Sequence, residues 1–182
     1  MGRLALLLLV AAAAAGRPAP AAAKALLSAD EALELAFPGC RVERRTVYLT
    51  AAQLERAREL AGIDVPGALV HPYVATCDGV VAGTAYFDTH RVRTLPETLM
   101  VAVGADGEVR RVEVLTFREP PEYLPRRPWY QQFDGERLDG DLRLERDIRS
   151  IAGATLTARA TADAVRRVLA VHRVLAEPKG PR

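Results

Sequence analysis

The clearest pattern of apolar and polar positions lies near the end of the chain. From about Thr157 to Leu175, mostly apolar side chains recur three or four residues apart, at positions 161, 164, 165, 168, 169, 172 and 175. This spacing places them on one face of a helix, and the arginines of the segment lie largely outside that face. The pattern predicts a long amphipathic helix.

Two shorter helices are predicted in the first third of the chain. Ser28 has the side chain of an N-cap, and Glu31 stands three residues later, where a capping box places its acid. Thr50 is the corresponding cap for a helix over residues 51–61, and Gly62 follows as its C-cap.

The middle of the chain predicts a sheet. Residues 41–50 alternate in part and indicate a first strand. Further β-rich runs flank Asp78-Gly79, a strong hairpin signal, and flank residues 105–107. Strands joined by tight turns pair antiparallel. We therefore expect an α+β fold, a twisted antiparallel sheet with packed helices, in a single domain.

The segment from Arg118 to Gly140 has no regular period. It contains four prolines and four aromatic residues. Segments of this length without a pattern are usually functional or disordered, and the aromatic content argues against disorder. Two interpretations stay open, a bed for a ligand ring or plugs that pin the loop, for Tyr123, Trp129, Tyr130 and Phe133.

The first residues have the features of an export signal. Arg3 precedes an apolar run over residues 4–15, and small residues follow up to Ala23. The run is short for crossing a bilayer, so cleavage after Ala23 is expected, with an uncleaved anchor as the alternative. The expected organisation is a signal peptide, a helical and strand extension, a principal domain and a flexible tail, over residues 1–23, 24–69, 70–176 and 177–182.

The charge of the chain bears on its partners, and its cysteines bear on disulfide formation. The chain has 25 basic and 23 acidic residues, but residues 1–23 hold two arginines and no acid, so the remainder is balanced. No basic stripe interleaved with aromatic residues is present, and no nucleic-acid partner is expected. Cys40 and Cys77 are the only cysteines. They form one disulfide or remain two separate buried thiols.

The candidate chemistry lies in "IAGATLTA", residues 151–158, where the long helix should begin. Free amides and the positive end of a helix dipole suit a phosphate. Gly153 permits positive φ, and Ala154 keeps the turn uncrowded. Thr155 then offers a hydroxyl to a phosphate, while Thr157 is the natural cap. Plain capping is the alternative reading.

"SIAGATLTARA" resembles the flavinylation site of the FMN-binding domain family, which includes the periplasmic flavin subunits of the Rnf complex and of the sodium-translocating NADH:quinone reductase. The resemblance implies that a flavin transferase joins FMN to Thr155 through a phosphoester. Asp147 stands upstream, where the family often has an acid. The chain departs from the pattern at Ala152, where Ser or Thr is usual, and at Arg149, which is frequently acidic.

The resemblance extends over roughly residues 70–175. A strand, Asp-Gly and strand unit leads into Glu119-Pro120, and "WYQQFDG" follows from Trp129. It implies that Glu119, Tyr123 and Trp129 belong to the cofactor site, with the last two among the candidates for the flavin ring. His90 lies at a strand end, where it is a candidate to stabilise a reduced flavin or simply part of a polar turn with Asp88, Arg91, Arg93 and Glu97.

The expected function is electron transfer by an exported protein, in the periplasm or on the outer face of the cytoplasmic membrane, with a membrane-bound or soluble redox partner. The sequence contains no Gly-x-Ser-x-Gly, His-Glu-x-x-His or Gly-x-x-x-x-Gly-Lys motif, which favours a carrier over a substrate-turnover enzyme. The alternatives are a flavin-dependent reductase of a small molecule and a flavin-free exported binding module.

Overall fold

The computed structural model describes residues 26–177, so the predicted signal peptide and the tail beyond residue 177 lie outside the described residues. Its elements are, in chain order, α1 Ala29–Ala36, β1 Arg41–Arg44, β2 Val47–Tyr48, α2 Ala51–Ala61, β3 Leu69–Val70, β4 Tyr73–Cys77, β5 Val80–Arg91, β6 Pro96–Gly104, β7 Val109–Phe117, the 3-10 turn η1 Pro121–Tyr123, α3 Arg127–Tyr130, the 3-10 turn η2 Gln131–Phe133 and α4 Thr155–Ala176.

A five-stranded sheet in the order β1-β4-β5-β6-β7 forms the centre of the molecule, and every neighbouring pair is antiparallel. This confirms the predicted α+β class. Asp78 and Gly79 both have positive φ, 51° and 80°, as a two-residue hairpin turn requires, and they join β4 to β5 as expected.

The single strand predicted over residues 41–50 is wrong. The segment forms β1, which pairs with β4, and β2, which pairs with β3 in a separate two-stranded sheet. The partner run is interrupted in the same place, between Val70 and Tyr73. Pro72 lies in that gap and has no N–H to donate to a ladder, so neither side can continue as one strand.

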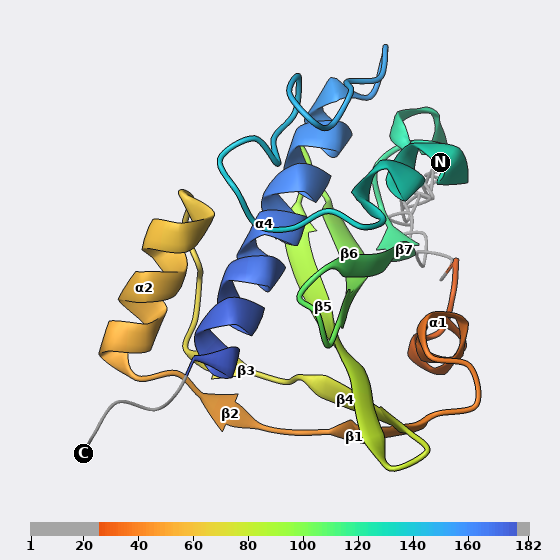
Figure 1. Cartoon of the computed structure of the whole chain (residues 1–182). Coiled ribbons are helices and arrows are strands. Elements are labelled where there is room, and N and C mark those ends of the chain that lie inside the picture. The colour runs from red at the N-terminus through yellow and green to blue at the C-terminus, as the bar shows by residue number, and fades with distance from the viewer. Residues whose placement is uncertain (1–25, 178–182) are drawn as a thin grey trace, which may run out of the picture.

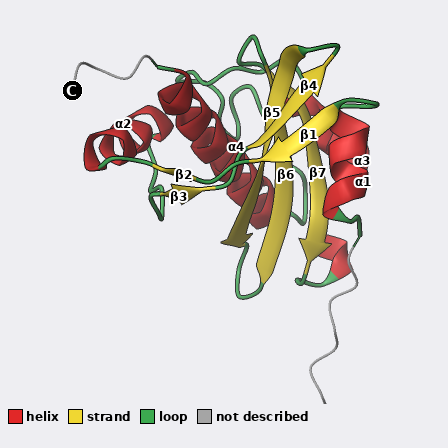
Figure 2. Ribbon diagram, turned by 90° about the horizontal axis from the view of Figure 1, so that it is seen from below, coloured by secondary structure: helices red, strands yellow, loops and turns green. Residues whose placement is uncertain are grey.

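Helices cover both faces of the large sheet. Along β6, Leu99, Val101 and Val103 join the core under α4, whereas Met100 and Ala102 join the core under α1. Figure 2 shows α4 and α1 on opposite sides of the strands. Because β6 is buried on both faces, its sequence from Leu99 to Val103 is entirely apolar and does not alternate.

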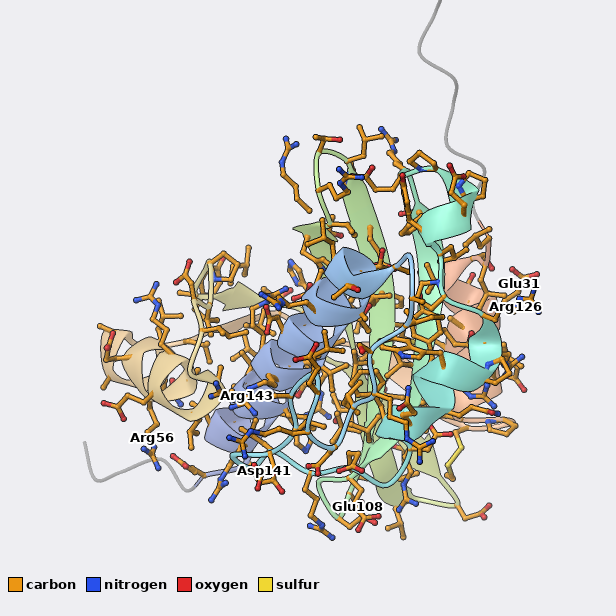
Figure 3. All side chains as sticks on the ribbon, turned by 90° about the horizontal axis from the view of Figure 1, so that it is seen from above. Glu31, Arg56, Glu108, Arg126, Asp141 and Arg143 are labelled. Atoms are coloured by element: carbon orange, nitrogen blue, oxygen red, sulfur yellow. A yellow bond between two sulfur atoms is a disulfide. The ribbon has the colours of Figure 1, made fainter. Side chains whose placement is uncertain are left out.

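The helix α2 packs against α4 and not on the large sheet, as Figure 1 shows. Arg166 of α4, only 3% exposed, ties these parts together. Its Nε donates to the carbonyl of Ala61 at the end of α2, and its Nη1 donates to the carbonyls of Asp139 and Leu142. Arg143 lies on the same side of α4, toward α2 (Figure 3).

The amino-terminal extension is bonded into this fold. The predicted capping box is present at Ser28, and Thr50 caps α2 as predicted, in a capping box with Gln53. Cys40 and Cys77 form a disulfide that joins the start of β1 to the end of β4, so the alternative of separate thiols is wrong. Among the described residues, no helix combines the length and apolar character needed to cross a membrane.

Candidate functional site

The helix α4 begins at Thr155, two residues before the predicted start. The prediction that Thr157 caps it is wrong: Thr157 is the third residue of the helix and is 1% exposed. Its hydroxyl donates to the carbonyl of Tyr123 at 2.8 Å. This hydrogen bond satisfies the hydroxyl inside the fold and fixes η1 to the first turn of α4.

The amino end of α4 has no side-chain cap. Gly153 makes the turn before it with φ 83°, a left-handed conformation that favours glycine. Ala154 is the N-cap residue, and its methyl group offers no hydrogen bond. The first amides of a helix have no partner within the helix, and a helix of 22 residues adds the positive end of its dipole. This end therefore suits an anion.

Thr155 is exposed at this end. Its hydroxyl donates to the carbonyl of Ile151 at 3.4 Å, near the limit for a hydrogen bond. No other side-chain bond holds the hydroxyl within the described residues. It is therefore free to take part in chemistry.

A pocket of about 210 Å³ adjoins Thr155. Three segments form it: the turn between β5 and β6, the 3-10 turn η1, and the amino end of α4. The lining residues are Arg93, Tyr123, Gly153, Ala154, Thr155, Leu156 and Thr157. Arg93 is the one charged residue among them, and its guanidinium carbon lies 5.5 Å from the centre of the Tyr123 ring.

Glu119 does not line this pocket but holds one of its walls. One carboxylate oxygen accepts hydrogen bonds from the backbone amides of Arg93, Thr94 and Leu95, at 3.2, 2.7 and 2.8 Å. The bonds from Leu95 and Thr94 lower the pKa of Glu119 most. The ionised carboxylate thus fixes the turn that presents Arg93.

Trp129 and Asp147 lie around a second hollow, of about 590 Å³, on the loop that leads into α4. The indole of Trp129 donates to the carbonyl of Arg149 at 2.8 Å and so holds that loop. Tyr130 and Phe133 are 5% and 0% exposed in the core. These two rings are therefore plugs that pin the loop, one of the two interpretations left open above, and they offer no surface to a ligand.

His90 lies between two carboxylates and lines neither hollow. Its ring nitrogens are 2.8 Å from Asp88 and 3.2 Å from Glu97, and Asp88 also binds Arg167 of α4. Burial alone would lower the pKa of His90, but the hydrogen bonds and charges of both carboxylates outweigh it and raise the pKa to about 9. The imidazole is therefore charged at neutral pH.

Two contacts could not be predicted from the sequence, because their partners lie far apart along the chain. Arg167 meets Asp88 across 79 residues, and Glu119 meets the turn at Arg93 across 26. The contact between His90 and Glu97 could have been predicted in part, because the β5–β6 hairpin places these two residues opposite each other.

A comparison with protein-family models finds a match that contains Thr155. The family model described as the FMN-binding domain matches residues 95–170, from the start of β6 into the second half of α4. The match includes Glu119, Tyr123 and Thr155 and stops just short of Arg93. No curated protein matches the chain. Residues 95–170 of this chain therefore match the FMN-binding domain family, and this match supports FMN binding.

Proposed function

We propose that this chain is an exported electron carrier whose FMN is attached through a phosphoester to Thr155. The observation that carries the proposal is the position of that hydroxyl. It is exposed, weakly bonded and beside a pocket, at an uncapped helix end inside the matched domain.

The residues around Thr155 fit a flavin phosphate. The free amides of α4 would hold the phosphate, and the helix dipole would contribute about 0.3–1 kcal/mol at an exposed site. That contribution is too small to retain a dilute cofactor outside the cytoplasm. A covalent bond removes the translational cost of binding, on the order of several kcal/mol. Covalent attachment therefore suits an exported carrier.

Attachment requires an activated donor. The Thr155 oxygen would attack the flavin phosphorus of a donor that holds this phosphate in an anhydride. One O–P bond forms, the anhydride O–P bond breaks, the second phosphate leaves, and the hydroxyl proton passes to solvent or to a base of the transferase. The step involves no oxidation or reduction. A flavin transferase that supplies such a donor is thus the expected maturation partner.

The position of the site favours electron relay. Bound FMN supplies the redox chemistry, and the protein supplies attachment, orientation and local charge. Thr155 is exposed and Leu156 beside it is 49% exposed, so a cofactor held here lies near the surface. A redox partner can approach such a site directly. The Cys40–Cys77 disulfide supports export, because disulfides persist outside the cytoplasm.

Intact mass and visible absorbance test the proposal. The full chain is co-expressed with a flavin transferase and exported, alone and as Thr155→Val and Thr155→Ser. We expect the wild type and Thr155→Ser to gain one flavin phosphoryl group and its yellow absorbance. Thr155→Val should remain unmodified while its circular dichroism and thermal unfolding stay like those of the wild type.

A covalent flavin on Thr155→Val would move the attachment to another residue. A colourless wild type of unmodified mass would favour the flavin-free binding module. Steady-state turnover of a small acceptor, saturating with its concentration, would favour the reductase over the carrier.

A further inference from the structure

Arg93 is a charged residue without a counter-ion at the Thr155 pocket. It is exposed, and within the part of the chain that the structure describes its guanidinium forms no ion pair and no hydrogen bond. Two neighbouring arginines differ. Arg91 donates to the carbonyl of Thr94, and Arg167 pairs with Asp88. Arg93 therefore has all of its donors available.

Two contacts position Arg93, one at its backbone and one at its side chain. The carboxylate of Glu119, 7% exposed, binds three successive amides of the turn from Arg93 onward. The ring of Tyr123 supports the guanidinium from below, and the hydroxyl of Thr157 fixes the backbone of Tyr123 to α4. The side chain is thus tied to the same helix end that carries Thr155.

An unpaired guanidinium on a turn whose backbone is fixed needs an explanation, because most of the neighbouring charged side chains have partners. The cation–π contact with Tyr123 occupies none of the N–H groups of the guanidinium. Those groups can bind two oxygens of a phosphate at once.

We propose that Arg93 binds the phosphate of the flavin at Thr155, with Glu119 and Thr157 as positioning residues. This inference rests on the proposed function and assigns to Arg93 a role that lies outside the matched residues 95–170. The α4 amides neutralise the phosphate from the side of the helix, and Arg93 neutralises it from the side of the turn. The site thereby selects a flavin that carries a phosphate over one that does not.

The test compares two free flavins on the unloaded full chain. FMN and riboflavin share the ring and differ in the phosphate, and their fluorescence reports binding. The variants are Arg93→Gln, Arg93→Lys and the matched control Arg118→Gln, an exposed arginine that does not line the pocket. Loss of one hydrogen-bonded charge should weaken FMN binding by roughly 10- to 100-fold in Arg93→Gln.

Riboflavin binding should not change in Arg93→Gln, Arg93→Lys should recover part of the FMN affinity, and Arg118→Gln should match the wild type. Equal losses for both flavins, or no loss for either, would overturn the assignment. A second measurement covers the case in which free flavins bind too weakly. In the transferase-loaded chain the ³¹P resonance of the phosphodiester should move in Arg93→Lys and not in Arg118→Gln, and an unmoved resonance would also overturn it.

The positioning role of Glu119 has its own readout. Glu119→Gln should reduce FMN affinity and leave riboflavin affinity unchanged, and it should add nothing further when Arg93 is already Gln. Additive effects would separate Glu119 from Arg93. Failure of the wild type to take up flavin would reject the proposed function, whereas a loaded wild type with an indifferent Arg93 would reject this inference alone.

Discussion

The imidazole of His90 binds carboxylates on both of its nitrogens. Asp88 shares its charge between His90 and Arg167, while Glu97 has no exposed surface and His90 as its hydrogen-bonded partner. Burial raises the pKa of Glu97, which opposes part of the stabilisation that the ionised pair would give. The charge of His90 therefore stabilises the fold as long as the imidazole stays protonated.

This arrangement predicts a loss of stability in alkali. The folded pKa of His90, about 9, exceeds the unfolded value near 6.5, so folding favours the protonated form. The stabilisation is complete below about pH 6.5 and disappears as the pH rises through about 9. We expect the wild-type free energy of unfolding to fall by roughly 1–3 kcal/mol across this range in urea titrations, and the His90→Gln curve to be nearly flat.

His172→Gln is the matched control. Burial lowers the pKa of His172, so its effect on stability appears as the pH falls below about 6.5 and not in the alkaline range. Between pH 6.5 and 9.5 this variant should follow the slope of the wild type. A His90→Gln curve with the same alkaline slope as the wild type would contradict the role given to His90.

Residue types predicted local contacts well and distant contacts poorly. Ser28 and Glu31 form the expected capping box because both partners lie in one turn. Thr157 has the same capping chemistry but bonds to Tyr123, 34 residues away, so its preference alone could not place it. The motif predicted that Thr155 lies near the start of the long helix. The pocket beside it could not be predicted, because one of its walls is the turn at Arg93, which only tertiary packing brings there.

At the scale of elements, the start of α4 depends on the conformation of Gly153. Its φ of 83° costs an L-residue about 1–2 kcal/mol, although no atom lies within 4 Å of an added methyl group. Gly153→Ala should therefore fold but lose about 1 kcal/mol in chemical denaturation, and its covalent flavin loading should slow.

Gly140→Ala controls for the loss of glycine itself. Gly140 also has open space around it, but it is not among the glycines with positive φ. An alanine there should leave the free energy of unfolding within about 0.5 kcal/mol of the wild type and the flavin loading unchanged. Similar effects of the two substitutions would show that the left-handed turn does not control the start of α4.

Element types followed from periodicity, and element partners did not. The alternation in residues 41–50 correctly indicated extended chain, but it contains no information on which strand lies beside each half. The structure of the irregular segment, residues 118–140, was also only partly predictable. Phe133 and Tyr130 were visible as aromatic residues, yet their burial in the core depends on the β7 strand and α4 that surround them.

For the whole molecule, the disulfide adds a covalent link to the strand pairing and helix packing that join the amino-terminal extension to the sheet. It joins residues 37 apart, at the edge formed by β1 and β4. A crosslink that closes a loop of this length lowers the conformational entropy of the unfolded chain. In the loop-entropy model this stabilises the folded state by about 4 kcal/mol. The Cys40→Ser/Cys77→Ser variant should therefore have a free energy of unfolding roughly 2–4 kcal/mol lower than that of the oxidised wild type. Urea titrations measure this difference.

Reduction provides the matched control, because a reduced wild type and the double serine variant should unfold at nearly the same urea concentration. Both cysteines lie outside the matched residues 95–170 and outside the residues around Thr155. Flavin loading of the folded double variant should accordingly equal that of the wild type. If reductant left the unfolding of the wild type unchanged, the bridge would not stabilise the extension. If loading fell with the bridge, the extension would have to act on the flavin site through α2 and α4, the two helices that Arg166 ties together.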